Sequence, residues 1–276
     1  MKKLFQKIND NKQLRNGIIL LTFLLIVAIM APVLATYDPF KLNDDILAHP
    51  GGKYLLGTDG LGRDVFSGIL YGARTSILVG VIAAVISAVI GIIIGGLAGY
   101  LGGKVDMVIS EIINIFLMLP TFFLILIVVA LFGSNLFNMM IIIGLTTWTS
   151  NAKLMRAQAL SLRERTFIKA QTTLGKSRAR ILIEHIIPNG IFPIIANTTM
   201  NISQAILLES SLSFLGLGDP NLISWGQMVF HGKSYLANGW WVSTFSGLAI
   251  VITVLAFYLI GDGLNNVLNP KLRAKR

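Results

Sequence analysis

RERTFIKAQTTLGKSRARILIEHIIPN, residues 163–189, is a strongly basic segment between long apolar runs. From residue 153 to residue 180 the chain has a single acid, Glu164, and eight basic side chains, which are Lys153, Arg156, Arg163, Arg165, Lys169, Lys176, Arg178 and Arg180. Loops of membrane proteins that are rich in Lys and Arg stay in the cytoplasm. We therefore expect a cytoplasmic loop here, placed between two membrane spans and able to dock a cytoplasmic partner.

The rest of the chain has the composition of an integral membrane protein. Of its 276 residues, 54% are hydrophobic and 13% are charged, and the mean hydropathy is +0.73, whereas soluble domains average about 25% charged residues. A helix needs roughly 20 apolar residues to cross the hydrocarbon core. The uncharged runs predict an all-α membrane protein with six transmembrane helices, at residues 17–36, 75–101, 108–132, 136–155, 190–216 and 242–266.

The distribution of basic residues predicts that both termini are cytoplasmic. In that orientation 18 of the 23 Lys and Arg lie on the inner side, and the five on the outer side are Lys41, Lys53, Arg63, Arg74 and Lys233. The net charge of +10 then follows mostly from topology, so nucleic-acid binding is the weaker interpretation. The predicted divisions are a cytoplasmic segment (1–16), span one (17–36), an extracellular loop (37–74), a five-span core (75–267) containing the cytoplasmic loop 156–188, and a basic cytoplasmic tail (268–276).

The first span has an alternative interpretation as a secretory signal peptide, because residues 2–15 are basic and residues 33–35 resemble a cleavage site. The apolar stretch that follows is about 19 residues long, against the usual 7–15 of a signal core, which favours a span. The chain has no Cys, which excludes disulfides and thiolate metal sites.

Two glycine-containing segments have more than one interpretation. Glycines at positions 91, 95, 99 and 103 lie on one helix face, where they permit close packing either inside the chain or against another subunit. The loop 37–74 is rich in turns and carries Asp59, Arg63 and Asp64. These three charged residues indicate either an extracellular docking surface or a structural cap over the helix ends.

The fifth predicted span is unusually polar. Helical spacing puts Asn197, Asn201 and Gln204 near one face, and amide groups are poorly tolerated against lipid. We expect this face to line a translocation path. Glu209 is a functional candidate because ionisable residues inside spans are rare, but its place near the end of the span also fits a hydrogen-bonded structural acid.

Motifs for catalysis or for metal and nucleotide binding are missing from the sequence. The three histidines, His49, His185 and His231, are scattered, and no metal-binding pair, nucleophile elbow or phosphate-binding loop occurs. We therefore expect no enzyme activity, no metal site and no cofactor in this chain.

Three motifs carry a resemblance to a known family. Residues 163–171, then Gly175 and residues 185–189 resemble the cytoplasmic signature REREYV-EAA-x-x-x-G…HxxPN of importer permeases of the ATP-binding-cassette class. Residues 55–76 (LLGTDGLGRDVFSGILYGARTS) and 210–228 (SSLSFLGLGDPNLISWGQM) add two further matches. Together they are similar to the second permease subunit of the dipeptide, oligopeptide and nickel importer family, over almost the whole chain.

The resemblance implies partners and a location. It implies a second, homologous permease subunit, two cytoplasmic ATPases that hold the ATP and Mg, an extracellular or periplasmic substrate-binding protein, and the lipid of a bacterial or archaeal inner membrane. It also implies a cytoplasmic coupling helix between spans four and five. The residues implied for ATPase coupling are Arg163, Glu164, Arg165, Phe167, Lys169, Ala170, Gln171, Gly175, His185 and Pro188.

The chain departs from the family signature where Glu-Ala-Ala is expected, because it has Lys169, Ala170 and Gln171. The missing acid puts one charged contact with the ATPase in doubt. The surrounding basic residues are expected to meet an acidic ATPase rim, and the competing role is anchoring to anionic lipid headgroups.

The function implied is ATP-driven import of peptides, in which movement of the coupling helix switches the path between outward and inward access. Nickel or a metal chelate is the alternative cargo. A secondary transporter is the alternative class, disfavoured because no internal repeat is visible, and a membrane-embedded hydrolase lacks catalytic residues.

Overall fold

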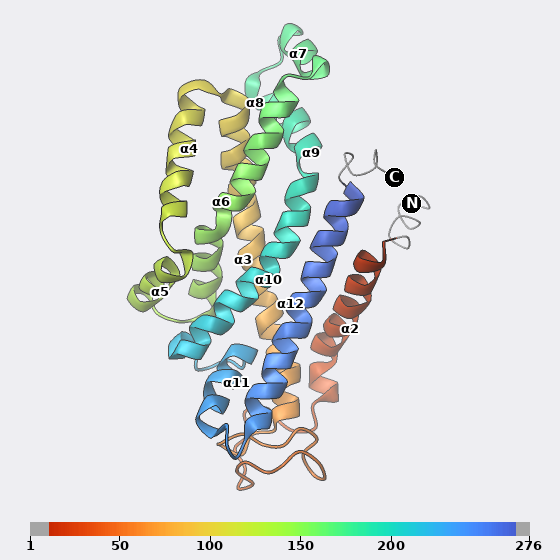
Figure 1. Ribbon diagram of the computed structural model, residues 1–276, viewed down its shortest axis with the longest axis vertical. Helices are drawn as coiled ribbons and strands as arrows, with labels where there is room; N and C mark the ends of the chain where they lie inside the picture. The colour runs from red at the N-terminus through yellow and green to blue at the C-terminus, as the bar shows by residue number, and fades with distance from the viewer. Residues whose placement is uncertain (1–10, 269–276) are drawn as a thin grey trace.

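The computed structural model describes residues 11–268, which form a bundle of long helices around the central α3 (Figure 1). The elements are α2 (Lys12–Leu34), α3 (Val65–Leu101), α4 (Gly103–Met118), α5 (Thr121–Phe132), α6 (Leu136–Arg163), α7 (Thr166–Thr173), α8 (Arg178–Ile181), the π-helical turn η1 (Leu182–Ile186), α9 (Ile187–Gly190), α10 (Phe192–Leu212), the π-helical turn η2 (Ser213–Leu217), α11 (Trp225–Gly232), the short 3-10 helix η3 (Lys233–Tyr235) and α12 (Trp240–Leu268).

Three of the described helices are long and apolar enough to cross a membrane, namely α2, α3 and α12. Two pairs of consecutive helices are bent at a short break, and each pair counts as one more span if it crosses the membrane as a unit. These pairs are α4 with α5, bent by 84°, and residues 178–190 with 192–217, bent by 63°. The prediction of a helical membrane protein is confirmed in this form. The helix α6, expected as span four, is 28 residues long but carries the polar run TTWTSNAK at residues 146–153.

The observed helices differ from the predicted spans at their ends. The helix α3 begins at Val65, ten residues before the predicted span, because Asp64 caps it by accepting from the backbone N–H of Ser67 at 2.9 Å. The predicted third span, residues 108–132, is broken in its middle, because Leu119 is extended and Pro120 follows, so α4 stops there and α5 starts in a new direction. An uncharged run hides such a break.

The helix α6 continues through what was predicted as the start of the cytoplasmic loop. Three of the eight basic residues, Lys153, Arg156 and Arg163, therefore lie on α6 and not in a loop. The first turn of α6 is capped by Asn135, which accepts from Asn138 at 2.8 Å, while the carboxylate of Asp219 accepts from the N–H of Leu136 at 3.0 Å.

Packing between α3 and α6 explains three of the four evenly spaced glycines. A Cβ on Gly91 would lie 2.5 Å from the Asn151 side chain, and one on Gly95 would lie 2.2 Å from the carbonyl oxygen of Ala152. Gly99 meets the backbone of the next turn of α6 in the same way. The prediction of packing inside the chain is confirmed for these three, whereas Gly103 opens α4 and has nothing within 4 Å.

The bundle has two ends that differ in content. The helix α7 lies at one end, here called the α7 end, and the start of α2 and the end of α12 lie in the same half of the molecule (Figure 1). The loop of residues 35–64 and α11 lie at the opposite end, here called the loop end. Trp241 ties α12 into this loop, because its indole N–H donates to the carbonyl of Thr58 at 3.0 Å.

Candidate functional site

The helix α7 is attached to α6 through one buried side chain. Ile168 packs in a cluster with Met155 of α6 and Ile181 of α8. Its neighbour Phe167 and the residue after α7, Leu174, are exposed, Leu174 to 76%. Large apolar side chains at the tip of a polar segment favour a protein contact, so α7 has an anchored face and a face available to a partner.

The turn after α7 depends on Gly175. Its φ is +77°, a conformation that L side chains rarely adopt, and a Cβ there would meet nothing within 4 Å. The N–H of Gly175 donates to Thr172 at 3.0 Å, and that of Lys176 donates to Gln171 at 3.2 Å. These bonds close the end of α7 in the manner of a glycine C-cap.

Two carboxylates organise the charges around α7. Glu164 accepts from Lys169 at 3.0 Å, and this contact, the largest cause, lowers the pKa of Glu164. Glu184 accepts from Arg180 at 2.7 Å and from Lys176 at 3.4 Å. The basic segment is therefore partly neutralised from within.

The segment after α8 contains two of the predicted coupling residues, His185 and Pro188. His185 Nε2 lies 3.1 Å from the amine of Lys176, and the side chain of Asn189 donates to the carbonyl of His185 at 2.6 Å. Pro188 sits in the first turn of α9, where a missing N–H is tolerated, and the chain before it widens into the π-helical turn η1. His185 thus joins the turn after α7 to the segment that leads into α9.

The predicted coupling residues that remain lie along α6 and α7. Arg163 donates to the carbonyl of Gly99 at 3.3 Å, which joins the end of α6 to α3. Arg165 precedes the first turn of α7, Ala170 is exposed, and Gln171 is half-buried. The ten predicted coupling residues occupy one continuous region, from the end of α6 to α9.

A polar network joins α3, α6 and α10 inside the bundle. Asn197 donates to the side-chain oxygen of Asn151 at 2.9 Å, and Asn151 donates to Ser87 at 3.3 Å. Asn197 and Asn201 also lie 3.4 Å from the hydroxyl of Ser150. Sequence reasoning missed the α6 members, although the polar run at 146–153 is the signal that could have found them.

The structure separates the other two predicted path residues from this network. Gln204 is exposed on the surface of α10, and among the described residues it makes no hydrogen bond with Ser150 or Asn151. Glu209 is 2% exposed and accepts from the hydroxyls of Ser213 at 2.8 Å and Ser224 at 2.7 Å. These bonds connect α10 to the start of α11, so the geometry favours the structural interpretation of Glu209.

The predicted docking residues at the loop end are less exposed than expected. Asp59 is 7% exposed and Asp64 is 1% exposed. Asp59 pairs with Arg63 at 2.7 Å and accepts from two backbone N–H groups of its own turn, while Asp64 caps α3. Of the two interpretations, the burial of both carboxylates favours the structural cap over an exposed docking surface.

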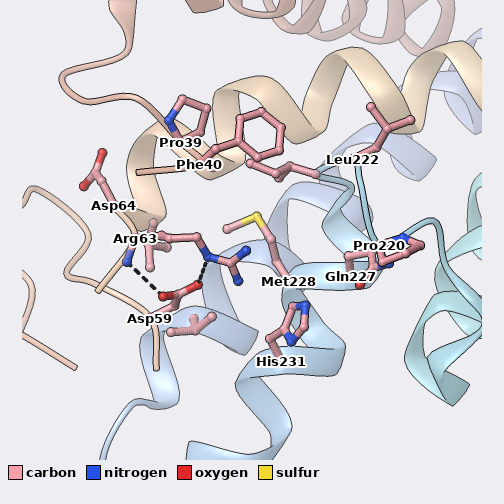
Figure 2. Close-up of a pocket in the computed structure, with 14 residues that line it drawn as sticks. Pro39, Phe40, Asp59, Arg63, Asp64, Pro220, Leu222, Gln227, Met228 and His231 are labelled. Atoms are coloured by element: carbon pink, nitrogen blue, oxygen red, sulfur yellow. Dashed lines mark hydrogen bonds and ion pairs between the residues drawn. The ribbon is translucent and has the colours of Figure 1, made fainter. Parts of the chain in front are cut away.

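A cavity lies between this loop and α11 (Figure 2). Its walls include Phe40, Arg63 and Asp59 from the loop and Met228 and His231 from α11. Figure 2 shows the Arg63 side chain extending from its ion pair with Asp59 toward Met228. Burial lowers the pKa of His231, and the nearby positive charge of Arg63 lowers it further. A neutral imidazole therefore forms part of the cavity wall.

Comparison with known sequences connects this arrangement to transport. The family described as "Binding-protein-dependent transport system inner membrane component" matches residues 89–274. The dipeptide transport system permease protein DppC of Escherichia coli is 42% identical over 271 residues, which covers 95% of this chain and 90% of that protein. The protein of the same name from Alkalihalophilus pseudofirmus is 36% identical and covers 98% of this chain and 90% of its own length.

One further sequence relative and one solved structure also resemble this chain. The di/tripeptide transport system permease protein DppC of Pseudomonas aeruginosa is 36% identical, with 99% of this chain and 93% of that protein covered. A chain of the MetNI methionine ABC transporter, solved in an inward-facing conformation, superposes with a TM-score of 0.58 at 18% identity. The match covers 72% of this chain and 96% of the MetNI chain.

Proposed function

Because this chain belongs to the family of binding-protein-dependent transport system inner membrane components, we propose that it is the permease subunit of an ATP-driven peptide importer. The subunit forms the membrane path and performs no chemistry. Dipeptide and di/tripeptide permeases among the relatives favour peptides over nickel as the cargo. We place the protein in the inner membrane of a prokaryote. It crosses this membrane six times, with α6 as span four, and both of its termini are cytoplasmic.

The observation that carries this proposal is the construction of the α7 end. The helix α7 is held by Ile168, turned by Gly175 and joined directly to α6, with the apolar side chains of Phe167 and Leu174 exposed. We propose that α7 is a coupling helix and that its exposed face binds a cytoplasmic ATPase. Coupling needs a rigid element that can occupy two discrete positions. The attachment of α7 to α6 would let closure of the ATPases move the spans in this way.

The cargo path is assigned to the polar side of α10 and α6. Asn197 is half-buried and Asn201 is buried where their side chains meet the exposed Ser150, and Gln204 is exposed beyond them. Exposed amides within an apolar bundle are costly against lipid. A second permease subunit facing this side would enclose the path, and neutral amides and hydroxyls suit a peptide backbone. Path lining is thus reassigned from Glu209 to the residues that border Ser150.

The loop end is assigned to the substrate-binding protein. Docking falls to the exposed side chains of the loop, such as Phe40, Leu42 and Leu55, and not to the buried Asp59 and Asp64. The partner ATPases supply ATP hydrolysis, and ATP and Mg bind there.

Reconstitution tests the proposal directly. The chain is placed in proteoliposomes with its homologous permease, two ATPases and the binding protein, and uptake of a labelled dipeptide is measured. We expect uptake only with hydrolysable ATP. Uptake driven by an ion gradient without ATP would support the secondary transporter, and uptake of nickel without dipeptide would overturn the assignment of the cargo.

A further inference from the structure

Lys153 occupies an unusual place for a lysine. It lies in the second half of α6, directly after Ala152, which packs on Gly95 of α3. Gly95 is six residues before the end of α3, so the backbone of Lys153 lies about 9 Å inside that end along the helix axis. Lysines within spans are rare and mark pathways or paired charges.

The charge of Lys153 is not compensated by the fold. Its side chain is exposed, and among residues 11–268 no carboxylate lies within ion-pair distance of its amine. The next basic residue on α6, Arg156, is by contrast held by Asp106 of α4 through a two-pronged contact, with Nη2 at 2.7 Å from Oδ2. The cation of Arg156 is thus built into the structure, whereas that of Lys153 remains available.

One turn before Lys153, α6 carries a polar side chain that belongs to the network with α10. Ser150 lies three residues before Lys153, which puts both side chains on the same side of α6. The hydroxyl of Ser150 is within 3.4 Å of the side-chain nitrogens of Asn197 and Asn201. A strip of neutral hydrogen-bonding groups therefore runs into a single positive charge.

We propose that Lys153 contacts the cargo directly and binds the carboxylate of a peptide as it passes along this strip. The inference rests on the proposed function, since it assumes that α6 and α10 line the path. A free peptide has one terminal carboxylate and a backbone of amides, and moving a bare carboxylate through a membrane is costly. An ammonium group at the inner end of an amide strip matches both parts of that solute, and a charge-assisted hydrogen bond is the stronger kind.

The absence of cysteine from the chain allows a chemical test. Lys153→Cys, in a complex whose other subunits are also freed of cysteine, is treated with methanethiosulfonates that add an ethylammonium, an ethylsulfonate or a methyl group. Dipeptide uptake should fall roughly tenfold or more on substitution, the loss typical of a charged hydrogen bond. The ethylammonium adduct should restore most of it, and the other two should not. Lys104→Cys, in the first turn of α4, is the control and should transport normally with every reagent.

Several results would overturn the inference. Failure of the charged reagents to reach the new thiol would show that position 153 faces lipid. Equal rescue by the methyl and ethylammonium groups would remove the role of charge. A defect that appears only in vesicles with anionic lipids would assign the lysine to headgroup phosphates. A wild-type complex that imports no dipeptide would instead overturn the proposed function, a result distinct from normal import by Lys153→Cys.

Discussion

Gly95→Ala tests whether the crossing of α3 and α6 is as close as the structure shows. The added Cβ would lie 2.2 Å from the carbonyl oxygen of Ala152 and 2.9 Å from its carbonyl carbon. Both are backbone atoms, so no side-chain rotation relieves the contact. The helices would have to separate by roughly 1 Å, which a close-packed interior accommodates poorly.

The neighbouring glycine provides a matched control and sets the magnitude. The nearest neighbour of a Cβ on Gly96, among the described residues, would be the Leu182 side chain at 3.5 Å. Gly96→Ala should therefore be neutral or should gain up to about 1 kcal/mol of helix propensity. Gly95→Ala has the same gain but adds an overpacking cost of about 1–3 kcal/mol, so we expect it to be less stable than Gly96→Ala by about 1–3 kcal/mol.

Both variants can be compared in one assay. The purified complex is unfolded in mixed micelles of rising SDS content and followed by tryptophan fluorescence, for which the chain has four Trp. The midpoint should fall for Gly95→Ala and stay or rise for Gly96→Ala, and peptide uptake should follow the same order. Equal midpoints for the two variants would refute the close crossing.

Three further predictions concern other parts of the molecule. Gly175→Val should abolish coupled uptake while the ATPases still co-purify, whereas Gly175→Asn should retain most of it, because the φ of +77° excludes a β-branched residue and the site is otherwise open; normal uptake by the Val variant would count against coupling through this turn. Glu209→Ala should lower the melting temperature more than Glu209→Gln, since each serine hydroxyl left unpaired inside the fold costs about 1–3 kcal/mol; the reverse order in thermal melting would exclude a structural acid. His231 is neutral in the folded chain because burial and Arg63 lower its pKa, so its contribution to stability is full above about pH 6.5 and declines as pH falls below that value, where the unfolded chain takes up the proton first. Melting temperatures measured between pH 7.5 and pH 5.5 should show this decline, and His231→Gln should flatten it.

The sequence was sufficient where a local pattern determines the structure. Uncharged runs predicted the long helices, and the four-residue glycine spacing predicted a close helix crossing, which the structure assigns to α3 and α6. The turn at Gly175 was also predictable, since only glycine takes that conformation easily. Each of these features depends on residues close together in the chain.

Features that depend on distant residues were not predictable. Asp59 and Asp64 stand among glycines and turns, which is typical of an exposed loop, but their burial is decided by contacts such as that between Trp241 and Thr58. The helical wheel put Gln204 on the face of Asn197, yet it could not tell which part of that face α6 would cover. The network around Asn151 likewise required knowing that α6 packs against both α3 and α10.

The unbroken length of α6 has a thermodynamic consequence. The helix runs for 28 residues, or about 42 Å, from the N–H of Leu136, held by Asp219 beside the loop end, to the two-residue turn that leads into α7. A ligand that binds at one end of α6 and stabilises one position of this helix also changes the affinity of the binding site at the other end. This coupling between the two binding sites is reciprocal. If a nucleotide lowers the affinity for an external protein by some factor, that protein, when bound, lowers the affinity for the nucleotide by the same factor.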